Sequence, residues 1–190
     1  MAAPATLDRA LSLAQRAVEL DPYMAEAHAT LGWILHWQYR RREALVTFQR
    51  AFKLNPNLVD GRYALLLMHN GRASDAVTYV LEALRQDPFP PPIYLSYLGN
   101  AYYMAGQYDE AYETLRRGRE RLPDYRAMTV WLAAAAALSG REAEAREAAD
   151  HVLTMAPNFT IAAWLRHIQF ERGADADRLA KGLRKAGLPS

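Results

Sequence analysis

The sequence contains no cysteine among its 190 residues. A disulfide framework, a thiol nucleophile and a cysteine-based metal site are therefore excluded. The sequence also lacks an excess of charge of either sign, because 23 basic residues stand against 21 acidic ones. This balance gives no electrostatic reason to expect nucleic acid or a membrane surface as the partner.

No apolar run in the sequence is long enough to span a bilayer. The most apolar stretch extends from Met128 to Leu138 and is bounded by Arg126 and Arg141, whereas a membrane helix needs about 20 residues. The many alanines of this stretch suit a tightly packed helix better. The residues from Met1 to Pro22 show no apolar signal-peptide core, and we expect a cytoplasmic protein.

The residue types used in catalysis are present without the patterns that catalysis requires. None of the five histidines belongs to a His-Glu-x-x-His motif. The glycines form neither a phosphate-binding loop nor a Gly-x-Ser-x-Gly elbow. Carboxylates such as Glu142, Glu144 and Glu147 are expected on a solvated helix face rather than in an enclosed acid–base pair. We therefore expect no enzyme, no metal site and no cofactor.

Two short arginine runs are the main basic clusters, at Arg40 to Arg42 and at Arg116 to Arg121. Nucleic-acid binding needs a continuous basic stripe. Acidic residues, among them Glu113 and Glu120, interrupt the second run. We therefore interpret both runs as solvated surface and expect no nucleic-acid partner.

Prolines recur along the chain at a nearly constant interval. They are Pro22, Pro56, Pro88, Pro123 and Pro157, spaced by 34, 32, 35 and 34 residues. Each follows a helix-like run, and proline ends a helix because it lacks an N–H and clashes with the preceding turn. This spacing predicts a repeat made of two helices.

The stretch from Tyr94 to Pro123 contains the features of one such repeat. Leu98, Gly99 and Tyr102 lie on one helical face, and Gly106 then breaks the helix. The stripe of the second helix consists of Tyr108, Ala111, Leu115 and Gly118. The small residues let neighbouring helices approach closely, and the aromatic ones fill the space between them.

This segment resembles the tetratricopeptide repeat, which has Leu-Gly, Tyr, Gly, Tyr, Ala, a large apolar residue, Ala and Pro at fixed offsets. An earlier unit matches the same pattern through Leu31, Gly32, Leu35, Ala44, Phe48, Ala51 and Pro56. The resemblance covers nearly the whole chain. It implies an all-α fold, a right-handed α-α superhelix of antiparallel helix pairs, whose function is to bind proteins.

On this basis we predict a single array over residues 1–190. Its parts are a lone second helix at 7–22, repeats at 25–56, 57–88, 92–123 and 126–157, and a degenerate repeat with a C-terminal cap helix at 160–187. The 57–88 repeat is two residues short, which a tight turn at Asn70-Gly71 or a shortened helix entry after Pro56 should absorb. Since natural arrays begin with a complete pair or a polar cap, the lone helix indicates a fragment of a longer protein, or else a native cap helix.

The C-terminal region carries a second resemblance. The phrase from Gly182 to Pro189 is similar to the tail of tetratricopeptide regions in bacterial multidomain regulators. Such regions are attached to a class III adenylate/guanylate cyclase or to a DNA-binding regulator domain, which implies a signalling context. Ahead of it, Thr160 to Glu171 is expected to form a helix, and Asp175 or Asp177 to cap a final helix that Gly187 ends.

The first helix of each pair lines the concave face of such a superhelix. The residues that helical phase places on this face, and that we predict to bind a partner, are Trp33, His36, Trp37, Tyr97, Asn100, Tyr103, Trp131 and Trp164. Aromatic side chains dominate protein-binding hot spots, and a contiguous exposed patch usually marks an interaction site. The alternative is that superhelical curvature buries these side chains against neighbouring helices.

The family's chaperone-binding members clamp an acidic tail with basic residues on this face. Asn100 holds one clamp-like position, but Ser96, Ile93, Trp131 and Ala127 replace the basic companions. We therefore expect an apolar or aromatic segment, such as a helix in the groove, or a second copy of the chain. The predicted function is a protein–protein interaction scaffold, and the alternative is a self-association module (a homodimer) with a structural role.

Overall fold

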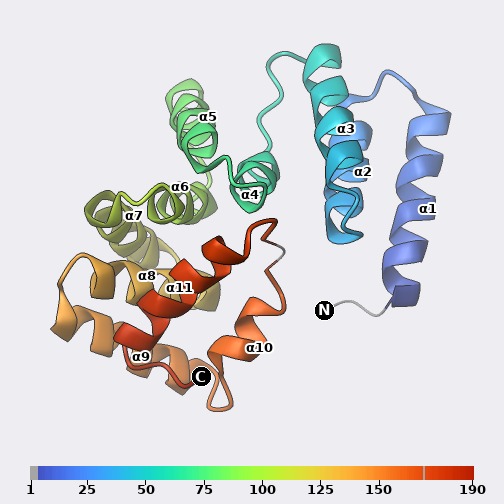
Figure 1. Cartoon of the computed structure of the whole chain (residues 1–190). Coiled ribbons are helices and arrows are strands. Elements are labelled where there is room, and N and C mark those ends of the chain that lie inside the picture. Colours follow the sequence, from blue (N-terminus) through green and yellow to red (C-terminus); the bar gives the residue numbers. More distant parts are fainter. Residues whose placement is uncertain (1–3, 169) are drawn as a thin grey trace. The chain divides into compact units, whose positions relative to one another are not determined.

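The computed structural model describes residues 4–168 and 170–190, which form eleven α-helices and no β-strand. The predicted all-α fold is therefore confirmed. Within each unit, helix pairs such as α2 and α3 or α8 and α9 run antiparallel and are joined by short turns (Figure 1). The chain divides into two compact units, Met1–Leu66 and Leu67–Ser190.

The first unit is built around the pairing of two helices that the proline spacing predicted. Its helices are α1 (Pro4–Leu20), α2 (Ala25–Trp37) and α3 (Arg41–Leu54), and α2 packs against both α1 and α3. Phe48 of α3 is fully buried at the centre, next to Leu35 and Leu66. Gly32 lies against it so closely that an added Cβ would stand 2.8 Å from the Phe48 ring. The Leu-Gly and Phe positions of the repeat pattern thus form one close contact between the paired helices.

Helix α4 (Arg62–His69) is shorter than α2, the corresponding first helix of the preceding repeat. It begins six residues after Pro56, whereas α2 begins three residues after Pro22. The turn that follows α4 is of the ordinary kind, because Gly71 has φ 68°, close to Gly106 and Gly140 at φ 83° and 82°. The two missing residues of this repeat are therefore lost at the helix entry and not at the Asn70-Gly71 turn.

The second unit continues the alternation of helices. Its central helices are α5 (Ala73–Gln86), α6 (Ile93–Met104), α7 (Tyr108–Arg121), α8 (Arg126–Leu138) and α9 (Glu142–Met155). Each helix from α5 to α8 packs against the next one in the chain. The alanine-rich α8 is buried along almost its whole length, because small side chains allow α6, α7, α9 and the C-terminal helix to contact it.

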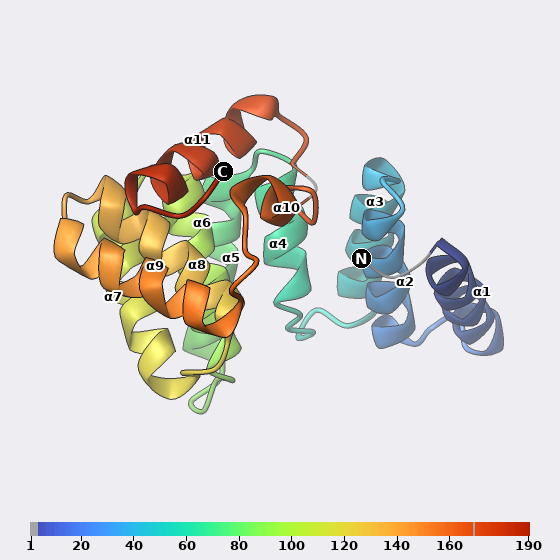
Figure 2. The ribbon, with the colours of Figure 1, turned by 90° about the horizontal axis from the view of Figure 1, so that it is seen from below.

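The C-terminal region departs from the repeat. The expected helix from Thr160 to Glu171 is wrong in extent: α10 (Ile161–Leu165) has five residues, and Gln169 lies outside the described residues. The Thr160 hydroxyl accepts the Ala163 N–H at 3.1 Å and so caps α10. The last helix, α11 (Gly173–Lys185), then runs back across α8 and also contacts α6 (Figure 2).

The expected caps of α11 are only partly correct. The N-cap residue is Arg172, whose side chain makes no capping hydrogen bond, so neither Asp175 nor Asp177 caps the helix. Asp175 lies within the first turn instead, where its charge is favourable to the helix dipole. At the other end Gly187 follows the helix with φ 95°, in the left-handed conformation expected of a terminating glycine.

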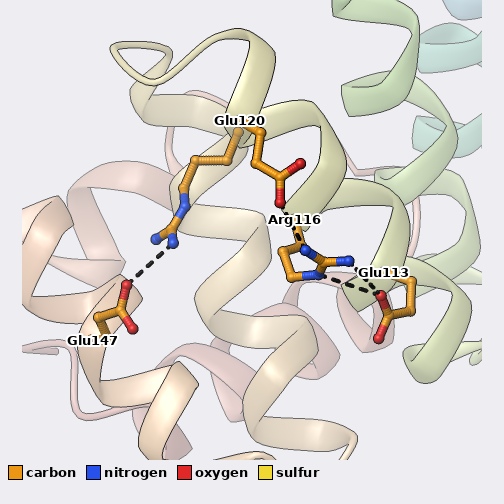
Figure 3. Close-up of polar contacts among 5 residues, drawn as sticks. Glu113, Arg116, Glu120 and Glu147 are labelled. Atoms are coloured by element: carbon orange, nitrogen blue, oxygen red, sulfur yellow. Dashed lines mark hydrogen bonds and ion pairs between the residues drawn. The ribbon is translucent and has the colours of Figure 1, made fainter.

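The longer arginine run lies on α7 and is matched by neighbouring carboxylates. Arg116 contacts Glu113 at 3.2 Å and Glu120 at 2.7 Å on the same helix (Figure 3). Arg119 contacts Glu147 of α9 at 3.1 Å. Such exposed pairs each contribute at most about 1 kcal/mol, but together they place carboxylates beside the arginines of this run.

Candidate functional site

The face shared by α6 and α8 is covered by α11. Tyr103 and Trp131 lie on this face with 0% and 3% exposure, and their rings meet edge to face at 5.4 Å. The Tyr103 hydroxyl donates a hydrogen bond to the backbone carbonyl of Arg178 at 2.8 Å. The expectation that these two side chains line an open groove is therefore wrong, because a helix of the same chain occupies that position.

The close packing of α11 depends on Gly182, which has no side chain. A Cβ at Gly182 would stand 2.3 Å from the Tyr103 hydroxyl oxygen and 3.0 Å from the Ala134 Cβ. Leu179 and Leu183 on the same helix are fully buried. Burial raises the pKa of Tyr103 far above its ordinary value, and the nearby Tyr108 raises it further. The phenol therefore stays protonated and remains a hydrogen-bond donor.

Asn100 and Tyr97 of α6 differ in their exposure. Asn100 is 5% exposed, and its Oδ1 has no hydrogen-bond partner among the described residues. Tyr97 is half-buried and contacts Tyr94 edge to face at 5.7 Å. Asn100 is thus no more accessible to a partner than Tyr103, whereas Tyr97 keeps part of its ring at the surface.

Trp33, His36 and Trp37 form an aromatic cluster on α2 in the first unit. The Trp33 ring stacks on His36 at 5.3 Å and meets Trp37 edge to face at 5.4 Å. His36 is fully buried, and both tryptophans are partly exposed. Burial, assisted by the positive charge of Arg41, lowers the pKa of His36 to about 4. The imidazole is therefore neutral near pH 7, and the outer surface of the cluster is formed by the two indoles.

Trp164 of α10 lies apart from the α6 and α8 residues and borders two adjoining cavities of about 330 and 590 Å³. We define the Trp164 pocket by the side chains Tyr125, Arg126, Met155, Phe159, Trp164 and His167. The Phe159 ring contacts the Trp164 ring at 5.8 Å. The indole Nε1 is buried and has no hydrogen-bond acceptor among the described residues.

The chemistry of the Trp164 pocket is mainly apolar with a polar margin. Tyr125 is 38% exposed at its edge, and burial of the remainder raises the pKa of its phenol. Arg126 and the exposed His167 supply the polar margin. A buried indole N–H without an acceptor usually finds one when a partner arrives. The lining of the pocket therefore combines aromatic ring surface with polar groups at its margin.

The sequence pattern contained an unused signal for this pocket. Tyr125 and Phe159 are each the second residue after a repeat proline, Pro123 and Pro157 respectively. The turns that follow these prolines bring both residues to the N-terminal ends of α8 and α10, beside Met155 of α9. The corresponding residues after the other repeat prolines are Met24, Leu58 and Pro90, so an aromatic residue at this position distinguishes the last two repeats.

Two properties of the described part of the chain bear on other functions. None of its helices has both the length and the apolar content needed to cross a bilayer. No group of three or more histidine and carboxylate side chains in residues 4–168 and 170–190 is arranged to hold a metal ion.

Paired antiparallel helices, close glycine contacts and turns of recurring geometry define this chain as a helical repeat protein. Two models of the tetratricopeptide repeat match it, one over residues 38–91 and the other over residues 67–129. No curated protein matches the chain in sequence. The family models and the similar solved structures together support the tetratricopeptide repeat family for this chain.

Three solved structures illustrate the similarity. The type IV pilus biogenesis factor PilW is 19% identical, with TM-score 0.74 over 95% of this chain and 82% of its own. YrrB, described as a tetratricopeptide repeat protein with an unusual peptide-binding site, is 20% identical, with TM-score 0.61 over 86% and 84%. MamA is 21% identical, with TM-score 0.59 over 82% and 92%. At such low identity these likenesses establish the fold and no more.

Proposed function

We propose that this chain is a protein–protein interaction scaffold without enzymatic activity, the tetratricopeptide region of a bacterial regulatory protein in the cytoplasm. The peptide-binding site described for YrrB supports the general class, because that protein shares the fold. The regulatory context rests on the similarity of the Gly182 to Pro189 phrase to the tails of such regions. The partner is a protein or peptide segment of apolar or aromatic character.

The observation that carries this proposal is the Trp164 pocket, which is lined by a partly buried indole ring whose N–H has no acceptor among the described residues. Trp164 offers a large apolar ring surface and one donor, and its Nε1 is buried without an acceptor among the described residues. Buried polar atoms are normally paired, and an unpaired one costs about 1–3 kcal/mol. A peptide carbonyl that accepts this hydrogen bond would remove the cost while its side chain fills the cavity.

The shape of the pocket favours an extended segment over a helix. Its lining comes from the turns at Tyr125 and Phe159 and from the end of α9 at Met155. A helix would need its own carbonyls for internal hydrogen bonds, whereas an extended segment presents free carbonyls. The α6 and α8 face, by contrast, already holds a helix in the form of α11.

Peptides selected from a random library against the full chain would test the proposal. We expect enrichment of apolar and aromatic residues, and a loss of affinity of about tenfold or more in W164A, as for a binding hot spot. W164F keeps most of the ring and removes the N–H, so it should lose a smaller, separate part of the affinity. F89A is the matched control, because Phe89 is an aromatic residue of the same unit with 89% exposure and no place in the pocket.

Two outcomes would contradict the proposal. Peptide affinity that is unchanged in W164A would remove the Trp164 pocket as the binding site. Loss of affinity in W33A/W37A with full affinity in W164A would transfer the role to the aromatic cluster of α2. Light scattering at two protein concentrations separates the alternative function, since a stable homodimer would indicate self-association in place of a foreign partner.

A further inference from the structure

A second cavity of about 450 Å³ lies in the same unit, away from the Trp164 pocket. We call it the arginine pocket and define its charged lining by Arg72, Asp75, Arg172, Asp175 and Arg178. These side chains come from the start of α5 and from the start of α11, and the end of α6 closes one side. The pocket is independent of the proposed peptide binding.

The chain fixes the walls of this pocket through several contacts. The Glu171 N–H donates to the His69 carbonyl at 2.8 Å and so ties the segment before α11 to the end of α4. The Arg172 guanidinium lies against Gly71, where an added Cβ would be 2.6 Å from its central carbon. Arg178 donates to the backbone carbonyl of Met104. Arg172, the N-cap residue of α11, and Arg178 within α11 are thus held beside the start of α5.

The pocket combines features that favour an anion. The N-terminus of the 14-residue α5 lines it, and the side chain of the N-cap residue Arg72 makes no capping hydrogen bond. A helix N-terminus carries partial positive charge and free N–H groups, and arginine pairs well with oxyanions. Asp75 is bound to Arg72 at 2.6 Å, so one of the two carboxylates is already neutralised. Arg172 and Arg178 supply the positive charge that is left in the pocket for an anion.

Asp175 provides the independent observation that points to a particular ligand. The residue is only 6% exposed, and its Oδ2 is buried without a hydrogen-bond partner among the described residues. An ionised carboxylate can only accept hydrogen bonds. A ligand that satisfies the pocket therefore presents negative oxygens to the arginines and a hydrogen-bond donor, O–H or N–H, to Asp175.

We propose that the arginine pocket binds hydrogen phosphate. Inorganic phosphate keeps at least one O–H throughout the neutral pH range, and its remaining oxygens accept hydrogen bonds from Arg172, Arg178 and the N-terminus of α5. Sulfate has the same size and charge but no O–H in this range. It would leave Asp175 unsatisfied and bring two negative groups together. The buried carboxylate thus selects phosphate against sulfate.

Titration calorimetry of the full chain with inorganic phosphate, sulfate and glycine at constant ionic strength tests this assignment. We expect phosphate to bind about tenfold or more tightly than sulfate, the effect of one unsatisfied buried hydrogen bond. R172Q should weaken phosphate binding by a similar factor. D175N should reduce the phosphate preference towards unity, because an amide can donate to sulfate. R184Q, an exposed arginine of α11 outside the pocket, should change nothing.

Circular dichroism spectra and melting temperatures show whether each variant is folded. A loss of binding that comes from misfolding can therefore be told from a loss of the binding site. Binding of phosphate and sulfate with equal affinity would overturn the proposal, as would an unchanged preference in a folded D175N protein. Absence of phosphate binding to the wild-type chain would also overturn it. Binding of glycine in place of phosphate would assign the pocket to a zwitterion, with its ammonium on Asp175, and would likewise refute the hydrogen phosphate assignment.

Discussion

The hydroxyl of Tyr103 on α6 donates a hydrogen bond to the backbone carbonyl of Arg178 on α11, across 75 residues of sequence. The two residues meet because α11 lies over α6 and α8. The same arginine returns a side-chain hydrogen bond to the carbonyl of Met104, next to Tyr103. This reciprocal pair fixes α11 on the face where the sequence pattern placed an open groove.

Replacing Gly182 by alanine should dislodge α11. The new Cβ would clash with the Tyr103 hydroxyl at 2.3 Å and would press on Ala134 at 3.0 Å. Overpacking of this kind costs about 1–3 kcal/mol, which equals or exceeds the gain of about 1 kcal/mol in helix propensity. Faster hydrogen exchange of the α11 amides and a lower unfolding midpoint in urea would show the effect.

The control for G182A is G173A on the same helix. A Cβ at Gly173 meets nothing within 4 Å, and its φ is not positive. We expect this variant to be neutral or more stable by up to about 1 kcal/mol. An equal change in stability in G182A and G173A would contradict the close packing of α11 at Gly182.

Replacing Tyr103 by phenylalanine should destabilise the second unit by about 1 kcal/mol. The change keeps the ring contact with Trp131 and removes only the donor to Arg178. Urea unfolding followed by tryptophan fluorescence measures it. Y23F, at an exposed phenol in the first unit, should leave the midpoint unchanged, and an equal loss in both variants would show that the buried hydrogen bond contributes nothing.

The helix pairs follow directly from residues in the sequence. Proline spacing predicts where pairs begin, and positions such as Gly32 and Phe48 predict the contact that joins α2 to α3. These are local signals, because each repeat brings its own residues together within about 34 positions. The all-α fold could therefore be predicted without knowledge of long-range contacts.

The covering of the α6 and α8 face could not be predicted in this way. Helical phase identifies the side of α6 that carries Tyr103, but it does not say whether solvent or another helix lies there. The answer depends on the early end of α10 at Leu165, which releases the chain to run back as α11. In the sequence, Gly182 is a residue that reflects this packing, but a glycine within a helix has several possible explanations.

Replacing Tyr39 by glycine should stabilise the first unit. Tyr39 has φ 61° at the turn after α2, whereas glycine occupies the equivalent place after α4, α6 and α8. A non-glycine residue in the left-handed region costs about 1 kcal/mol. We expect Y39G to gain at most about 0.5 kcal/mol, because the loss of a cation–π contact with Arg41 offsets about 0.5 kcal/mol or more of the relief.

Y39A is the control for Y39G, because alanine loses the ring but keeps the Cβ that causes the strain. It should show no gain in stability. Hydrogen exchange of the α2 and α3 amides reports the local free energy of opening for both variants. A glycine variant that is no more stable than the alanine variant would contradict the strain at this turn.

The stability of the first unit should fall as the pH decreases from 6.5 to 4, because of His36. Burial, and then the charge of Arg41, lowers its folded-state pKa from 6.5 to about 4. Between pH 6.5 and pH 4 the imidazole is protonated in the unfolded chain but mostly neutral in the folded chain. The contribution of His36 to the free energy of unfolding is therefore fully present above pH 6.5 and decreases below it. Between about pH 7 and pH 5 the expected loss is about 2 kcal/mol.

Hydrogen exchange of the α2 amides at both pH values measures this loss. H36Q should flatten the dependence by about the same amount, because glutamine does not titrate, whatever its effect on absolute stability. R41Q should keep most of the pH dependence of stability, because burial is the larger cause of the low pKa of His36. The Trp33 and Trp37 rings still surround the imidazole in this variant. If R41Q flattened the curve as completely as H36Q, the positive charge and not desolvation would control His36.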